Sequence, residues 1–316
     1  MKRILFILIL LNFKVFSQGF NKVDNQVQNY KFIRSAEQLA QKIDLDFNSD
    51  IEKIRAIYTW ITLNIKYYNP KTNAFLLKEP QTIVYFDEDD LKRRLKLIDD
   101  KIVRETFLSK KGVCNNIALV FNKVCNLLDI ENELIKGFVK SSAEEINIVP
   151  KLKNHIWNSV KINNHWIYID ATYGISYDSN LLKSKSNYTY FNISKDKLRL
   201  THYPSKSKWV KLMGQAPLNF FSKLPVFSDN FFNYNSVLIS PKNGIINSAN
   251  KKVTIILKNL NPDTLITYKY EGSFTSKKPV VIYKNLNTSI IINKPKKGKF
   301  LTLYFNNTSV LTYNVI

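Results

Sequence analysis

The sequence has few of the residues that build metal centres and disulfide scaffolds. Its 316 residues include two cysteines and three histidines, which excludes a disulfide-rich fold and any four-cysteine metal site. Arginine is also scarce, because forty of the 47 basic residues are lysine and seven are arginine. Base readout and bidentate phosphate binding favour arginine. The formal net charge of +22 therefore favours an anionic polymer or membrane surface over nucleic acid as the acidic partner.

The first 17 residues predict a secretory signal peptide. Lys2 and Arg3 precede a continuous apolar run over residues 4–11, and a cleavage site is expected after Ser17. The run is too short to span a bilayer, and a retained membrane anchor is the alternative. We expect an exported protein that is periplasmic, cell-surface or secreted, with no transmembrane segment in the mature chain.

Three helices are predicted before residue 130. Ser35 and Ser49 are each followed three residues later by a Gln or Glu, as in a capping box, and a third helix is expected to begin near Cys114. The last two helices carry apolar residues at helical spacing: Ile54, Ile57, Tyr58, Ile61 and Ile65, and then Ile117, Ala118, Phe121, Val124, Cys125 and Leu128. Residues 71–105 are predicted to be irregular, with their acidic and basic runs forming a solvated surface.

Strand patterns follow the third helix and then dominate. Residues 156–162 and 166–171 predict a hairpin around Asn163-Asn164. A stretch with two prolines and many Phe and Asn residues, 217–235, predicts a linker. Beyond it, short β-rich runs recur about every ten residues, as in a β-sandwich: 237–239, 253–257, 265–270, 280–283, 289–292, 300–305 and 310–315. We predict two domains, residues 18–225 and 226–316.

Cys114 is the candidate nucleophile. It follows Gly112 at the predicted start of a helix, where the positive end of the helix dipole favours a thiolate, and Lys110 and Lys111 act in the same direction. Cys125 lies on the apolar stripe and is predicted to be a buried hydrophobe. The eleven residues between the two cysteines rise about 16 Å in a helix, whereas bridged Cα atoms lie within about 7 Å. Both cysteines are therefore predicted to be free.

The hairpin supplies the base and the carboxylate that such a nucleophile needs. With a two-residue turn at 163–164, Ile162 faces His165, and His155 and Asp170 become diagonal neighbours on one face. Diagonal residues lie about 7–8 Å apart, which an imidazole and a carboxylate can span. A register slip of one residue would place them on opposite faces, and a purely structural His155 is the alternative.

The two other histidines are not expected to take part. His165 flanks the turn and is predicted to be solvent-exposed, and His202 is predicted to be a packed loop residue rather than a second base. Three scattered histidines do not make a zinc site. The sequence predicts no metal and no cofactor.

Taken together, these motifs resemble the transglutaminase-like superfamily of papain-like thiol enzymes, and within it a bacterial kyphoscoliosis-peptidase-like branch. The similarity covers about residues 50–212 and keeps the order and spacing of several motifs: residues 56–61 with 65–67, Lys111–Cys114, His155–Asn158, Asp170–Gly174, and Tyr190-Phe191 followed by 201–204 and Trp209. The resemblance implies an α+β fold, in which a papain/transglutaminase-like core with its helix-start cysteine packed on an antiparallel sheet precedes an all-β Ig-like sandwich.

By this resemblance, Cys114 is the nucleophile, His155 the general base and acid, and Asp170 the orienting carboxylate. The implied reaction is acyl transfer through a thioester on a peptide or protein substrate, as in a peptidase, an amidase or a transglutaminase. The implied oxyanion donors are the Cys114 amide and an upstream side chain.

One departure from the family pattern leaves a second hypothesis open. Asn115-Asn116-Ile117 stand where relatives usually carry a small residue that is often followed by an aromatic one. The alternative is a catalytically inactive binding or scaffold module of the cell envelope. Residues 226–316 carry 12 lysines against 3 acidic residues, a net charge of +9, which suggests docking on an anionic envelope polymer.

Overall fold

The computed structural model describes residues 20–68, 82–140, 142–178, 183–293, 295 and 297–316. The predicted signal peptide, residues 1–17, lies outside this range. The chain divides into two units, residues up to 135 with 156–193, and residues 136–155 with 194–316. None of the described helices combines the length and the apolar character needed to cross a membrane.

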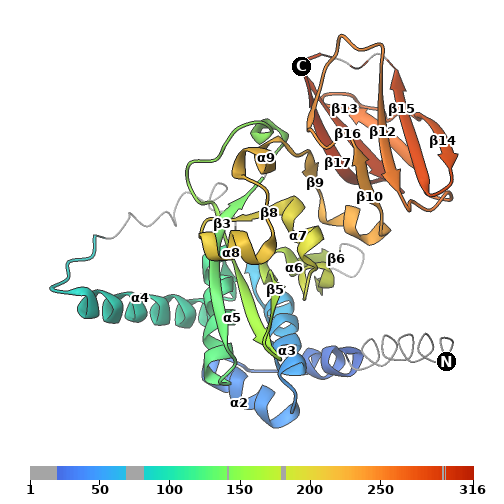
Figure 1. Ribbon diagram of the computed structural model, residues 1–316. Helices are drawn as coiled ribbons and strands as arrows, with labels where there is room; N and C mark the ends of the chain where they lie inside the picture. The colour runs from blue at the N-terminus through green and yellow to red at the C-terminus, as the bar shows by residue number, and fades with distance from the viewer. Residues whose placement is uncertain (1–19, 69–81, 141, 179–182, 294, 296) are drawn as a thin grey trace, which may run out of the picture. The chain divides into compact units, whose positions relative to one another are not determined.

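Helices dominate the first unit (Figure 1). After a helical stretch over residues 20–28 they are α2 (Ala36–Asp46), α3 (Asp50–Asn64), α4 (Glu88–Ser109), α5 (Cys114–Leu127) and the short α6 (Ala171–Gly174), with a 3-10 turn η4 (Tyr188–Tyr190). Helix α3 is buried continuously from Ile54 to Thr62, and α5 packs against α2, α3, α4 and α6. These two helices therefore form the centre of the core.

The predicted helix starts are confirmed. Ser35 is the N-cap of α2, and its hydroxyl accepts a hydrogen bond from the Gln38 backbone N–H. Ser49 is the N-cap of α3, but its hydroxyl donates to the Glu52 carboxylate instead of bonding the backbone. The apolar faces predicted for α3 and α5 are buried, except that Leu128 is partly exposed.

The prediction that residues 71–105 are irregular is wrong for the part that the structure describes. Residues 88–109 form α4, the longest of the helices named above. Asp87 caps it by accepting hydrogen bonds from the N–H groups of Asp89 and Asp90. The acidic run is thus the first turn of a helix, where negative charge is favourable, and the basic residues one turn later pair with it, as in Arg94–Asp90.

A four-stranded sheet in the order β5-β4-β3-β8 carries the predicted hairpin (Figure 1). Its strands are β3 (Asn132–Val139), β4 (His155–Ile162), β5 (His165–Ile169) and β8 (His202–Pro204). Ile162 pairs with His165 as expected, because Asn163 and Asn164 both adopt positive φ, 48° and 63°, as a tight two-residue turn requires. The first unit also contains two small strand pairs: β1 (Lys66–Tyr67) with β2 (Lys111–Gly112), and β6 (Ile175–Asp178) with β7 (Lys183–Ser186).

The C-terminal strands form the predicted β-sandwich. One sheet has the order β10-β12-β15-β14 and the other β11-β17-β16-β13, with β9 paired to β17. Each predicted run coincides with a strand, and β9 and β11 are additional: β9 (Val226–Phe227), β10 (Val237–Ser240), β11 (Ile245–Ile246), β12 (Lys252–Lys258), β13 (Ile266–Tyr270), β14 (Val280–Lys284), β15 (Asn287–Asn293), β16 (Lys299–Phe305) and β17 (Thr308–Val315). Alternate residues of β15 and β16 are buried, as expected for strands with one face on a core.

Short helices precede the sandwich in the second unit. They are α7 (Lys195–Thr201), α8 (Ser207–Met213) and α9 (Leu218–Lys223), with 3-10 turns η3 (Ala143–Glu145) and η5 (Asp229–Tyr234). The segment 217–235, predicted to be a linker, thus contains α9, β9 and η5, and its Phe231 and Phe232 are buried.

Candidate active site

Cys114 is the first residue of α5, as predicted, and its side chain is only partly buried. The residues before it are held by the parallel pair β1–β2, in which Tyr67 is aligned with Gly112. The Tyr68 N–H donates to the Gly112 carbonyl at 3.0 Å. The β1–β2 pair therefore fixes the backbone just before α5 and places the thiol at the N-terminus of that helix.

Asn116 stabilises the backbone that leads into Cys114. Its side-chain oxygen accepts a hydrogen bond from the Val113 N–H at 3.2 Å, and its amide donates to the Thr106 hydroxyl at 3.1 Å. Gly112 lies directly beside it, because a Cβ atom at position 112 would approach the Asn116 Cβ to 2.6 Å. The departure from the family pattern at Asn116 thus has a structural role: the residue holds the backbone that presents Cys114.

Cys125 behaves as predicted. It is fully buried on the apolar face of α5, burial raises the pKa of its thiol, and both cysteines are free. Cys125 is therefore an internal reference for the reactivity of Cys114.

Asp170 does not continue the hairpin ladder as expected. The last pair is Asn158 with Ile169, after which the chain turns into α6 with Asp170 as its N-cap. Asp170 Oδ1 accepts hydrogen bonds from the N–H groups of Thr172 at 2.8 Å and Tyr173 at 3.2 Å. The carboxylate is 1% exposed and is held rigidly by these bonds. The hairpin pairing therefore stops before it reaches His155, because α6 replaces the end of the strand.

Asp170 nevertheless lies beside His155. His155 begins β4, Asp170 follows β5, and His202 begins β8, so all three lie at strand ends of the four-stranded sheet. One ring nitrogen of each histidine and one carboxylate oxygen lie within 4.8 Å of one another. All three residues are buried. The structure therefore brings together the predicted base and its predicted carboxylate.

His202 is the residue that sequence reasoning missed. It is completely buried, it lies in a strand rather than a loop, and its ring meets the His155 ring edge-on at 5.3 Å between centroids. Its Nδ1 atom lies 2.8 Å from the Thr201 hydroxyl. The three histidines were expected to be scattered, but His155 and His202 lie together. His165 is exposed as predicted. Two imidazoles and a carboxylate are also ligands that zinc accepts.

Tyr67 interacts electrostatically with both the thiol and the carboxylate. Its phenol is half-exposed on β1. Burial is the largest cause that raises its pKa, and electrostatic interactions with Cys114 and Asp170 raise it further. Both groups therefore lie within electrostatic reach of one phenol. The signal in the sequence was the position of Tyr67 in a motif quoted for the resemblance, but no rule of spacing placed it beside Cys114.

Comparisons with known proteins bear on this site. Residues 37–171, which include Cys114, His155 and Asp170, match the family model of the transglutaminase-like superfamily. The kyphoscoliosis peptidase of Mus musculus is 22% identical over 257 residues, which cover 80% of this chain and 36% of that protein. The kyphoscoliosis peptidase of Homo sapiens is 22% identical over 259 residues, covering 81% and 36%.

The chain thus spans little more than a third of the length of these curated relatives. A solved structure of a TGase is 15% identical, covers 57% of this chain and 42% of its own, and has a TM-score of 0.29. Both peptidases are mammalian, so the narrower resemblance to a bacterial branch stays a prediction.

Proposed function

Because residues 37–171 belong to the transglutaminase-like superfamily, we propose that the chain is a thiol acyl-transfer enzyme that acts on amide bonds of peptides or proteins. The observation that carries this proposal is the proximity of His155 to a rigidly held Asp170, in a domain whose partly exposed cysteine begins a helix. Covalent catalysis requires a nucleophile, a base and an orienting group, and Cys114, His155 and Asp170 can supply one of each.

The proposed reaction has two halves. The Cys114 sulfur attacks the substrate carbonyl, and His155 takes the thiol proton and gives it to the departing amine, which leaves a thioester. Water or an amine then attacks the thioester, with His155 as base, and the thiol is regenerated. Asp170 fixes the orientation of the imidazole and stabilises its charged form. Its backbone bonds keep it in place during both steps.

Two donors are proposed for the oxyanion that forms on the carbonyl oxygen. The first is the Cys114 N–H at the start of α5, where N–H groups lack helical partners. The second is the Tyr67 phenol, which is aligned with Gly112 across the β1–β2 pair. A phenol with a raised pKa stays protonated and able to donate near neutral pH.

Alkylation by iodoacetamide tests the proposal, because Cys125 provides an internal control. We expect Cys114 to be carboxamidomethylated in the folded protein while buried Cys125 stays unmodified, as measured by peptide mass spectrometry. Replacing His155 with alanine should slow the reaction of Cys114 at neutral pH by at least about tenfold, because the thiol loses its base. A Cys114 that reacts no faster than a free thiol, with no dependence on His155, contradicts the proposal.

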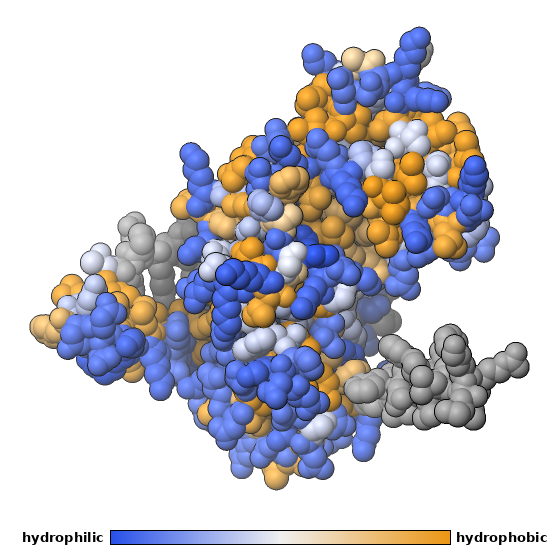
Figure 2. Space-filling model, in the orientation of Figure 1, coloured by the Kyte–Doolittle hydropathy of each residue, from blue (hydrophilic) through white to orange (hydrophobic). Residues whose placement is uncertain are grey.

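We also propose that the protein is exported and that its C-terminal strands dock on an anionic envelope polymer. The support is the net charge of +9 in residues 226–316, and Figure 2 shows hydrophilic side chains among apolar ones over these strands. The full chain should bind immobilised teichoic acid or heparin at low salt and elute as salt is raised, equally for wild type and Cys114→Ala. Retention that salt does not change, or no retention, contradicts docking by charge.

A further inference from the structure

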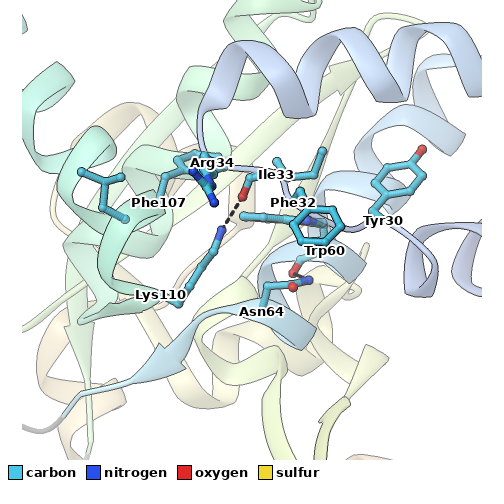
Figure 3. Close-up of a pocket in the computed structure, with 9 residues that line it drawn as sticks. Tyr30, Phe32, Ile33, Arg34, Trp60, Asn64, Phe107 and Lys110 are labelled. Atoms are coloured by element: carbon cyan, nitrogen blue, oxygen red, sulfur yellow. Dashed lines mark hydrogen bonds between the residues drawn. The ribbon is translucent and has the colours of Figure 1, made fainter.

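A cavity of about 400 Å³ lies outside the catalytic cluster, in the first unit. Figure 3 shows the three segments that form it. Phe32 and Arg34 come from the chain before α2, Trp60 from α3, and Phe107 and Lys110 from the end of α4. Its size is that of a pocket for a small organic molecule.

Two cations and no acidic residue line this cavity. The Lys110 ammonium donates a hydrogen bond to the Ile33 carbonyl at 2.7 Å and lies 4.4 Å from the centre of the Trp60 ring. Burial lowers the pKa of Lys110. Among the residues that the structure describes, neither Lys110 nor Arg34 forms an ion pair, so the cavity has an unbalanced positive charge.

The apolar wall of the cavity contains a hydrogen-bond donor with no acceptor. Trp60 and Phe107 stack with their ring centres 5.0 Å apart, and each is 1% exposed. Within the described part of the chain, the Trp60 Nε1–H has no hydrogen-bond partner. Because this atom and both rings are almost completely covered, the groups that an outside acceptor can reach in the cavity are the two cations.

The backbone at the cavity is also held in an unusual conformation. Phe32 has a φ of 59° and Lys110 a φ of 55°, a region that L-residues with a Cβ rarely adopt. The Phe32 side chain is 86% exposed. The Lys110 conformation is that of the C-cap of α4, a common way to end a helix, and the two positions bring an aromatic ring and a cation to the same cavity.

We propose that this cavity binds the carboxylate of an organic acid that carries an apolar or aromatic group. The two carboxylate oxygens accept hydrogen bonds from the Lys110 ammonium and the Arg34 guanidinium, two cationic donors for a planar acceptor with two oxygens. The apolar group packs against Phe32, whose side chain is 86% exposed. The acid is either a free small molecule or the C-terminal residue of a peptide.

The probe is N-acetylphenylalanine, and its C-terminal amide is the uncharged control. Binding to the full chain carrying Cys114→Ala is measured by isothermal titration calorimetry, so that no chemistry interferes. We expect the acid to bind with a Kd of about 1 mM or better, and the amide at least about tenfold more weakly. A tripeptide ending in phenylalanine distinguishes the two sources of the carboxylate. Binding as tight as that of the probe indicates that the cavity takes the C-terminal residue of a peptide. Weaker binding indicates that it takes a free acid.

Two variants locate the binding. Arg34→Met, at an exposed position, and Lys110→Met should each weaken binding of the acid at least about tenfold and leave binding of the amide unchanged. Lys101→Met, on an exposed residue of the same helix, is the control and should have no effect.

Any of three results overturns the proposal. The acid and the amide bind equally, Arg34→Met leaves binding of the acid unchanged, or the acid does not bind at about 10 mM. Because Cys114 is absent from the protein tested, these outcomes leave the proposed acyl transfer unaffected.

Discussion

Replacing Cys114 with alanine is expected to lower acyl transfer from p-nitrophenyl acetate to the level of the uncatalysed reaction, a loss of at least about a thousandfold. The sulfur is the atom that forms the covalent intermediate, and neither His155 nor Asp170 can replace it. The measurement is steady-state release of p-nitrophenol. The side chain is only partly buried, so the substitution leaves the core intact, and an unchanged melting temperature verifies this.

Cys125→Ala is the matched control. It removes the other thiol of the chain from the buried face of α5. We expect it to cost stability, by about 1 kcal/mol as for other small reductions of buried volume, while turnover per folded molecule stays within about twofold. Equal losses of turnover in both variants, or a Cys114→Ala protein that keeps full activity, would show that the ester is cleaved elsewhere.

The second large effect is expected from Asp170→Asn. Asparagine keeps the side-chain oxygen that accepts from Thr172 and Tyr173, so the cap of α6 is retained and the melting temperature should change little. The negative charge that orients His155 and stabilises its charged form is lost. We expect kcat to fall about 10²–10⁴-fold with a small change in KM. Steady-state kinetics on the same ester measures both quantities.

Two further readouts separate catalysis from stability in this case. Asp170→Ala removes the cap as well, so it should lower the unfolding free energy by about 1 kcal/mol beyond Asp170→Asn. The Asp170 charge also contributes to the raised pKa of Tyr67. In Asp170→Asn the pKa of Tyr67 should therefore fall toward its ordinary value of 10.0, because phenolate is no longer opposed by that charge; NMR of labelled tyrosine follows it. If Asp170→Asn keeps wild-type turnover, a group other than Asp170 orients His155.

Local signals were enough to predict much of the fold. The starts of α2 and α3 follow from Ser35 and Ser49, and the hairpin register follows from two asparagines that tolerate positive φ. The strands of the sandwich are short alternating runs separated by turn residues, so their positions could also be predicted. In each case the determining residues lie within a few positions of the element that they define.

Features that depend on distant residues could not be predicted. Helix α4 has few apolar residues on a regular face, so its sequence predicts an irregular segment, although Asp87 and the acidic residues after it form a helix N-terminus. His202 reaches the site because β8 pairs with β3, which no local pattern indicates. Arg55 lies in the buried stretch of α3 and forms a buried ion pair with Asp24 at 2.7 Å.

The candidate site was predicted in part for the same reason. Cys114 at a helix start and the hairpin register from Ile162–His165 to Asn158–Ile169 are local properties, and the structure has both. The turn of the chain into α6, by contrast, depends on Asp170 bonding the N–H groups that follow it. The position of Tyr67 beside Gly112 depends on a pairing across about 45 residues of chain.

Mass spectrometry of the intact protein after a brief reaction with p-nitrophenyl acetate and an acid quench tests the central claim most directly. The proposal predicts one added acetyl group, located on Cys114, released by hydroxylamine at neutral pH, and absent from Cys114→Ala. An acetyl group that resists hydroxylamine, that lies on another residue, or that persists in Cys114→Ala would contradict a thioester mechanism at this site.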